Sequence, residues 1–209
     1  MTGEPIADVP TLLASARDGD AAALGLLLER YRNYLLALAR VQIGRRLQRK
    51  VEEGDLVQET FLEAHRAFPR FRGTTEAELA YWLRQILAAR LAMLLRHYFG
   101  TAQRNLELER ELSDALDESS QTLGSAFVSD GTSPSQGAAR REQAVLLADA
   151  LARLPADYAR VLTLRHLDSL SFPEVAARMG RSVDAVEKLW ARALVKLRRE
   201  LDPAEGIDS

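Results

Sequence analysis

Apolar residues recur at helical spacing along most of the chain, and this pattern predicts a protein built from helices. Glycines, prolines and an Asp–Gly–Asp break separate the predicted segments. In the N-terminal half the pattern predicts helices over 11–17, 21–47, 56–68 and 76–99. In the C-terminal half it predicts helices over 140–154, 157–167, 173–179 and 182–199.

The last two of these segments have helix-turn-helix spacing. Ser171 and Pro173 are typical of a helix start, Gly180 of a helix end, and Ser182 of the next N-cap. The second helix separates two kinds of residue: Val183, Val186, Leu189, Trp190, Ala193 and Leu197 on one side, and Lys188, Arg192 and Arg199 on the other. A helix of this kind can lie in a DNA major groove, with its first turns on base edges and its later basic residues on phosphates.

Composition changes between residues 100 and 139, where seven acidic residues face two arginines and Ser and Gly become frequent. This favours a linker, although 105–116 could still form a charged helix. The prediction is an all-α fold of two small helical domains, the second with the helix-turn-helix. The predicted limits are 1–99, an acidic Ser/Gly-rich linker over 100–139, 140–203, and a tail over 204–209.

Bulk properties narrow the function. The net charge of −2 means that any affinity for DNA must come from local patches. The chain has no cysteine, no apolar run of membrane-spanning length and no visible secretion signal, so we expect a cytoplasmic protein without membrane insertion. Its three histidines are isolated and no phosphate-cradling loop or nucleophile motif is present, so no enzyme activity, catalytic residue, metal or cofactor is predicted.

Two separated stretches resemble the sigma-70 family of bacterial transcription initiation factors, in its small two-domain, extracytoplasmic-function group. DLVQETF (55–61), FRG (71–73) and WLRQI (82–86) resemble region 2 of that family, and residues 151–201 resemble region 4. The resemblance implies a non-catalytic subunit that binds core RNA polymerase and directs promoter-specific initiation by recognising −35 and −10 elements.

The resemblance also assigns residues. Region 2 of the family docks on the clamp helices of the polymerase β′ subunit, for which the matching positions are Asp55, Gln58 and Glu59. Region 2 also captures melted −10 bases, and the candidates are Phe71, Arg72, Gly73, Tyr81, Trp82, Arg84 and Gln85. Region 4 reads the −35 element and contacts the β flap, and the candidates are Arg181, Ser182, Asp184, Ala185, Lys188 and Arg192. The resemblance also raises an anti-sigma factor as a candidate partner, since many family members are held by one.

The chain departs from the family at positions that concern promoter sequence. Ala89 and Met93 stand where members often have Asn and Asp, and Leu189 and Leu194 stand where arginines are frequent. Two alternatives therefore stay open. One is a polymerase-independent, dimeric helix-turn-helix regulator whose N-terminal helices dimerise or bind a ligand. The other is an adaptor that binds polymerase without melting DNA.

Overall fold

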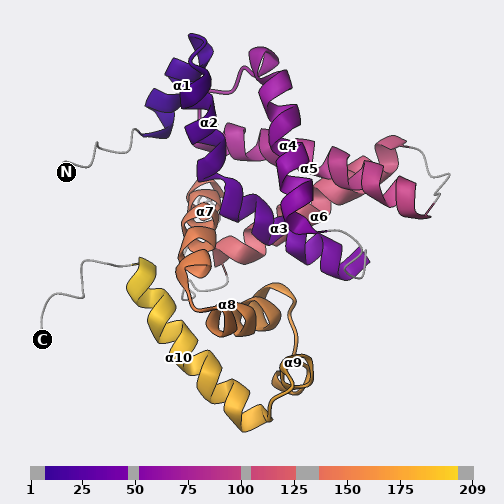
Figure 1. The fold of residues 1–209 in the computed structure, drawn as a ribbon, viewed down its shortest axis with the longest axis vertical. Coiled ribbons are helices and arrows are strands. Elements are labelled where there is room, and N and C mark those ends of the chain that lie inside the picture. The colour runs from indigo at the N-terminus through magenta and orange to yellow at the C-terminus, as the bar shows by residue number, and fades with distance from the viewer. Residues whose placement is uncertain (1–7, 47–51, 100–104, 126–136, 202–209) are drawn as a thin grey trace, which may run out of the picture. The chain divides into compact units, whose positions relative to one another are not determined.

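The computed structural model describes residues 8–46, 52–99, 105–125 and 137–201, and over these residues it contains helices and no strand (Figure 1). The chain divides into two compact units, Met1–Asp117 and Glu118–Ser209. The predicted all-α fold with two helical parts is confirmed for the described residues. Residues 100–104 and 126–136 of the predicted linker and the predicted tail, 204–209, lie outside them.

The first unit is a bundle whose core lies between long helices. Its elements are α1 (Val9–Arg17), α2 (Ala21–Arg30), α3 (Arg32–Arg46), α4 (Glu53–Ala67), the short 3-10 helix η1 (Phe68–Arg70), α5 (Glu76–Phe99) and the first part of α6 (Asn105–Ser125). Aspartates cap the first two helices, since Asp8 accepts a hydrogen bond from the Thr11 amide at 3.0 Å and Asp20 from the Ala22 amide at 2.8 Å. α4 packs against both α3 and α5, and this packing presents the outer face of α4 to solvent.

Two predicted helix limits were wrong. The predicted helix over 21–47 is broken at Tyr31, whose backbone lies outside the α region and ends α2. The break goes with burial of the Tyr31 and Tyr34 rings, which meet edge to face at 6.5 Å. The predicted helix over 56–68 begins earlier, at Glu53, so Asp55 lies in the first turn of α4. A carboxylate is also favourable there, since it faces the positive end of the helix dipole.

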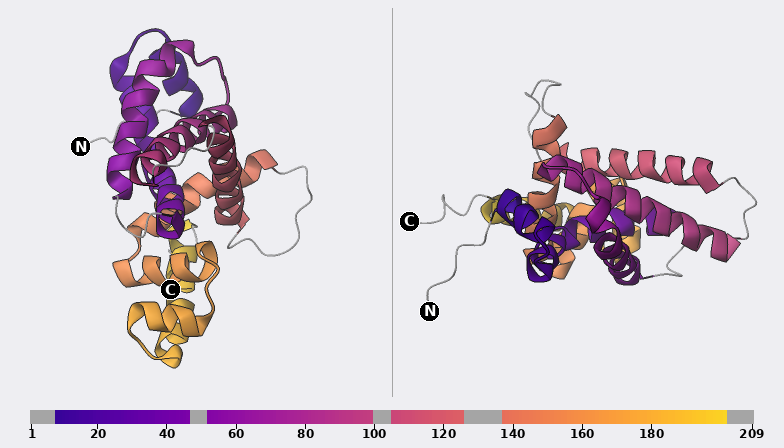
Figure 2. Two further views of the ribbon diagram at one scale, coloured as in Figure 1. Left: turned by 90° about the vertical axis from the view of Figure 1, so that its right-hand side faces the viewer. Right: turned by 90° about the horizontal axis from the view of Figure 1, so that it is seen from above.

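Residues 105–117, placed by composition in the linker, form a helix that belongs to the first unit. Leu108, Leu112 and Leu116 of this segment are buried. Figure 2 shows the first part of α6 beside α5 in the view from above. The boundary between the two units of the structure falls after Asp117. The predicted limits of the two domains, 1–99 and 140–203, stay predictions.

The second unit builds the helix-turn-helix on two helices and a π-helical turn. Its further elements are α7 (Gly137–Arg153), α8 (Ala156–Leu162), the π-helical turn η3 (Thr163–Leu167), α9 (Phe172–Met179) and α10 (Val183–Leu201). α10 packs against α7, α8 and α9, and its neighbours bury Val186 and Ala193 completely. Among the described helices, none combines the length and the apolar character that crossing a membrane would need.

Candidate functional site

Local hydrogen bonds fix the turn between α9 and α10. The backbone N–H and the hydroxyl of Ser171 donate to Glu174 Oε2 at 2.8 and 2.6 Å, and these bonds lower the pKa of Glu174. Gly180 has a left-handed φ of 65°, and the next amide, of Arg181, donates to the Ala176 carbonyl at 3.0 Å. Ser182 Oγ accepts from the Ala185 amide at 3.3 Å. The N-caps predicted at Ser171 and Ser182 and the glycine stop at Gly180 are confirmed.

α10 has one buried and one exposed side. Val186, Leu189, Ala193 and Leu197 are buried, as the pattern predicted. Val183 was predicted on the buried side but is exposed. It is the first residue of α10, and the packing of the helix on its neighbours begins after it. Trp190 is half-buried and its ring meets those of His166 and Phe172.

Five of the six residues assigned to the −35 element are exposed on the N-terminal half of α10 and the turn before it: Arg181, Ser182, Asp184, Lys188 and Arg192. Ala185 is half-buried between them. Lys188 Nζ pairs with Asp184 at 2.9 Å, and the Lys188 side chain remains 70% exposed. The Arg192 Nε–H donates to the Lys188 carbonyl at 3.2 Å, and Arg181 pairs with Asp157 of α8. The arrangement offers cationic groups to an anionic surface.

A second exposed stripe runs along α4. Asp55, Gln58 and Glu59 are exposed, and their spacing places them on one side of the helix. Leu62, one turn further on, is 53% exposed, and sequence reasoning missed it although its spacing from Asp55 and Gln58 continues the stripe. Glu63, the next residue, forms an ion pair with Arg90 of α5. The stripe therefore combines acidic, amide and apolar groups.

An aromatic cluster holds the loop between η1 and α5. Phe71 stacks on Trp82 with ring centroids 4.7 Å apart, and Phe68 meets Trp82 edge to face at 6.2 Å. Gly73 passes close to the Phe71 ring. A Cβ at this position would lie under 3 Å from that ring and 2.8 Å from Glu78 Cβ. Glu78 accepts hydrogen bonds from the Thr74 and Thr75 amides at 2.7 and 3.0 Å, which lower its pKa.

The seven residues assigned to the −10 element differ in exposure. Arg72 and Tyr81 are exposed, Gly73, Trp82 and Gln85 are half-buried, and Phe71 and Arg84 are buried. The Arg84 side chain is 1% exposed, and its guanidinium bonds Asp117 at 2.7 Å and the Tyr34 hydroxyl at 2.8 Å. Burial makes Phe71 and Arg84 supports of the surface, whereas Arg72, Tyr81, Trp82 and Gln85 present atoms on it. In the described part of the chain no group of acidic or histidine side chains could hold a metal ion.

Comparison with known proteins decides the family. Residues 27–98 match the family model for sigma-70 region 2, and residues 144–197 match the model for sigma-70 region 4. Together the two models cover more than half of the chain. The chain belongs to the sigma-70 family. The two matches contain, respectively, the α4 stripe with the aromatic cluster and the helix-turn-helix.

Similar proteins span nearly the whole chain. The ECF RNA polymerase sigma-E factor of Haemophilus influenzae is 27% identical over 192 residues, which are 92% of this chain and 94% of the relative. The RNA polymerase sigma-H factor of Pseudomonas aeruginosa is 28% identical over 193 residues, or 92% and 93% of the two chains. A solved structure of CnrH in complex with the cytosolic domain of CnrY is 27% identical, covers 95% of this chain and all of that chain, and has a TM-score of 0.31.

The protein is therefore an extracytoplasmic-function sigma factor of this family, a transcription initiation factor that associates with RNA polymerase and directs it to promoters. The resemblance carried by residues 55–86 and 151–201 is confirmed. The alternative of a polymerase-independent dimeric regulator is not favoured, because its N-terminal helices would have no reason to match region 2.

Proposed function

We propose that promoter recognition is divided between two surfaces that act only when core polymerase holds the protein. The exposed cationic side of α10 carries this proposal, because it provides Lys188 and Arg192 to duplex DNA on a chain whose net charge is −2. A chain with that net charge gains little affinity from general attraction to phosphates. Polymerase therefore supplies most of the attraction to the DNA backbone. Arg181, Ser182, Asp184 and Ala185 complete the −35 surface, and the same region contacts the β flap.

The α4 stripe is the proposed docking surface for the β′ clamp helices. Asp55, Gln58 and Glu59 provide acceptors for a basic partner, and exposed Leu62 adds apolar area at the end of the polar stripe. Binding in this way places the −10 surface of the same unit near the DNA that polymerase opens. The cytoplasm, where the chromosome is transcribed, is the proposed location.

Arg72, Tyr81, Trp82 and Gln85 form the proposed surface for unpaired −10 bases, with Gly73 keeping the loop close to the Phe71 ring. Tyr81 is 50% exposed and offers a ring on which a base can stack. Stacking on an aromatic side chain stabilises a bound base by about 1–3 kcal/mol, enough to bias local melting. An anti-sigma factor that covers these surfaces is a further proposed partner.

Run-off transcription with purified core polymerase tests the function as a whole. We expect promoter-dependent transcripts only when this chain is added, and a Lys188→Ala/Arg192→Ala variant should lose dependence on the −35 sequence. Arg198→Ala is the matched control, because it removes an exposed arginine from the same helix beyond the first turns. If the double variant kept the wild-type promoter preference, these assignments would be refuted.

Co-purification with core tests the docking surface separately. A chain with Asp55→Lys and Gln58→Lys should bind core more weakly, because both substitutions place a cation where the family docks on a basic surface. A chain with Ala14→Lys and Asp18→Lys, at exposed positions of α1 and the turn after it, gains the same three positive charges and controls for the change in net charge. Core binding that is equal in the two variants would contradict the assignment.

Tyr81→Ala tests base capture. We expect weaker opening of promoter DNA at unchanged affinity for core, measured by permanganate reactivity of unpaired thymines. A wild-type holoenzyme that binds promoters without any reactive thymines would instead support the adaptor alternative.

A further inference from the structure

The first half of α6 lies outside both family matches and yet is built into the unit that contains region 2. Residues 105–117 follow the match that ends at residue 98, and Leu112 and Leu116 are completely buried against the unit. Burial of this kind is typical of a fixed structural element, and it is not typical of a tether between domains.

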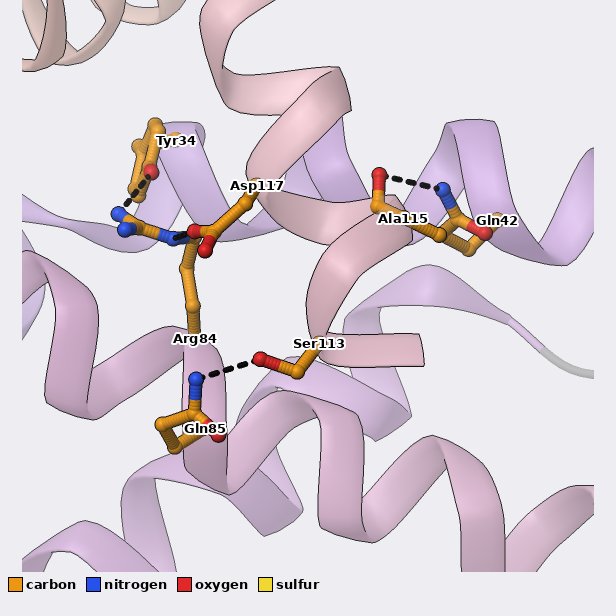
Figure 3. Close-up of polar contacts among 7 residues, drawn as sticks. All are labelled: Tyr34, Gln42, Arg84, Gln85, Ser113, Ala115 and Asp117. Atoms are coloured by element: carbon orange, nitrogen blue, oxygen red, sulfur yellow. Dashed lines mark hydrogen bonds and ion pairs between the residues drawn. The ribbon is translucent and has the colours of Figure 1, made fainter. Parts of the chain in front are cut away.

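Three polar side chains of α3 and α5 bond one turn of α6, and a fourth, Tyr34, bonds one of the three (Figure 3). Arg84 Nε donates to Asp117 Oδ1 at 2.7 Å, and Gln85 Nε2 donates to Ser113 Oγ at 2.5 Å. Gln42 Nε2 donates to the Ala115 carbonyl at 3.3 Å. The Tyr34 hydroxyl accepts from the other end of the Arg84 guanidinium at 2.8 Å. The α6 seam, as we name Ser113, Ala115 and Asp117, is therefore bonded to two consecutive residues of α5.

Of those two α5 residues, Gln85 belongs to the proposed −10 surface and Arg84 supports it from beneath. The Arg84 guanidinium carbon lies 5.7 Å from the centre of the Tyr81 ring, within the range of a cation–π contact. Buried Arg84 thus connects half-buried Asp117 to an exposed ring, and pairing with Asp117 offsets the cost of burying its charge. Gln85 is half-buried, and its bond to Ser113 fixes the direction of the amide.

We propose that Asp117 and Ser113 are positioning residues for capture of the −10 strand: Asp117 holds Arg84 beside Tyr81, and Ser113 orients Gln85. The functional module of region 2 then extends to Asp117, past the end of the family match. This inference rests on the proposed function of Tyr81 and Gln85. It makes the acidic composition of 105–117 part of the recognition apparatus, and it assigns Arg84 a supporting role without contact to DNA.

An alternative role for the same contacts is to block DNA from α5. Loosening the contacts would change DNA binding in opposite directions for a positioning role and a blocking role. Residues 105–117 carry five acids and one arginine, so the segment could compete with DNA for α5. A competitor would have to leave, which would expose two completely buried leucines and the charge of Arg84. The observed burial favours positioning. Loosening the α6 seam should therefore weaken capture of DNA, whereas loosening a competitor would strengthen it.

The experiment measures binding of a fluorescent fork-junction DNA with a single-stranded −10 segment to holoenzyme assembled from the full chain and core. We expect Asp117→Asn to weaken this binding about tenfold, the size of one lost charge-assisted hydrogen bond, at unchanged affinity for core. Asp117→Glu should recover part of the loss, and Ser113→Ala should weaken binding about threefold, as for one neutral hydrogen bond. Asp114→Asn, the loss of an exposed acid from the same helix, should leave binding unchanged.

Each alternative outcome has a separate meaning. Variants that bind as tightly as wild type, or more tightly, would overturn the positioning role. Parallel loss of core affinity and DNA binding in both Asp117→Asn and Ser113→Ala would also overturn it, because a purely structural role affects every surface of the unit. If wild-type holoenzyme itself does not discriminate the −10 strand, the proposed function of the surface fails, and this result is distinguishable from the others.

Discussion

The indole N–H of Trp190 donates a hydrogen bond to His166 Nε2 across 3.0 Å, and the two rings lie nearly parallel with centroids 6.1 Å apart. The bond joins α10 to the η3 turn beneath it. It requires His166 to be neutral, because a protonated Nε2 has no lone pair to accept with. Burial lowers the pKa of His166 below its ordinary value of 6.5, and the nearby charge of Arg165 lowers it further.

The stability of the helix-turn-helix unit should fall as the pH drops below about 6.5. Between the lowered pKa of the folded chain and the ordinary value, the unfolded chain binds a proton that the folded chain does not. Acid therefore favours unfolding in this window, and the loss ends below the folded pKa. Urea unfolding at pH 7.5 and 5.5, followed by Trp190 fluorescence in a Trp82→Phe background, measures the effect.

His166→Gln is the informative variant for that prediction, because a glutamine can place an acceptor near the indole but does not titrate. Its urea midpoint should change less between the two pH values than that of the parent. His65→Gln, at an exposed position of α4, serves as the control. A parent protein with the same pH dependence as His166→Gln would show that His166 has no part in it.

Gly73→Ala should destabilise the first unit. A Cβ at this position would lie under 3 Å from both the Phe71 ring and Glu78 Cβ, so the ring must leave its stack on Trp82 or the loop must move. Overpacking of this kind costs about 1–3 kcal/mol. Gly25→Ala in α2 is the matched control: its Cβ would meet nothing within 4 Å, and a helical alanine should stabilise the protein by about 0.5–1 kcal/mol. Urea unfolding followed by Trp82 fluorescence should shift in opposite directions for the two.

Gly180→Ala should destabilise the turn that leads into α10. The residue has a φ of 65°, and a Cβ in the left-handed region costs about 1–2 kcal/mol even where space is open around it. Gly180→Asn should cost less, because asparagine tolerates this conformation. The comparison of urea midpoints reports mainly the backbone effect, since a Cβ at this position meets nothing within 4 Å. Equal midpoints for the two variants would contradict it.

Local rules predicted the helix-turn-helix almost completely, because each of its limits depends on neighbouring residues. The bond between Ser171 and Glu174 spans three residues. Gly180 and Ser182 also bond groups within a few residues of themselves. The break at Tyr31 could not be predicted, since the apolar period continues through it and only burial of two tyrosine rings favours it.

Long-range partners limited prediction of the −10 residues. Arg84 was assigned to DNA because its motif resembles region 2, but its partner Asp117 lies 33 residues away in a stretch whose composition favours a linker. The leucines at 108, 112 and 116 were the available signal, since their spacing predicts one buried helical side. The net acidic charge and the Ser and Gly content of the same stretch favour a solvated linker, and they conceal this short apolar period.

Lys188 and Arg192 should separate into two kinds of DNA contact. Lys188 lies in the second turn of α10, where side chains reach base edges, and Arg192 lies one turn later, with its Nε bonded to the Lys188 carbonyl. Lys188→Ala should therefore reduce discrimination between −35 sequences by about 1–3 kcal/mol. Arg192→Ala should weaken all sequences alike and reduce the slope of log K against log salt by roughly 0.9, the value for one phosphate contact.

Asp184 gives this prediction an internal check. Its carboxylate pairs with Lys188 at 2.9 Å, and both side chains are mostly exposed, so the pair is worth little in the free chain. Asp184→Asn should leave stability nearly unchanged but alter the preference at the base that Lys188 contacts, because the ammonium group is no longer held back toward the helix start. Holoenzyme binding to a panel of −35 variants at two salt concentrations measures discrimination and slope together. If Lys188→Ala changed the slope and Arg192→Ala changed discrimination, the two roles would be exchanged, and α10 would lie in the groove in a different register.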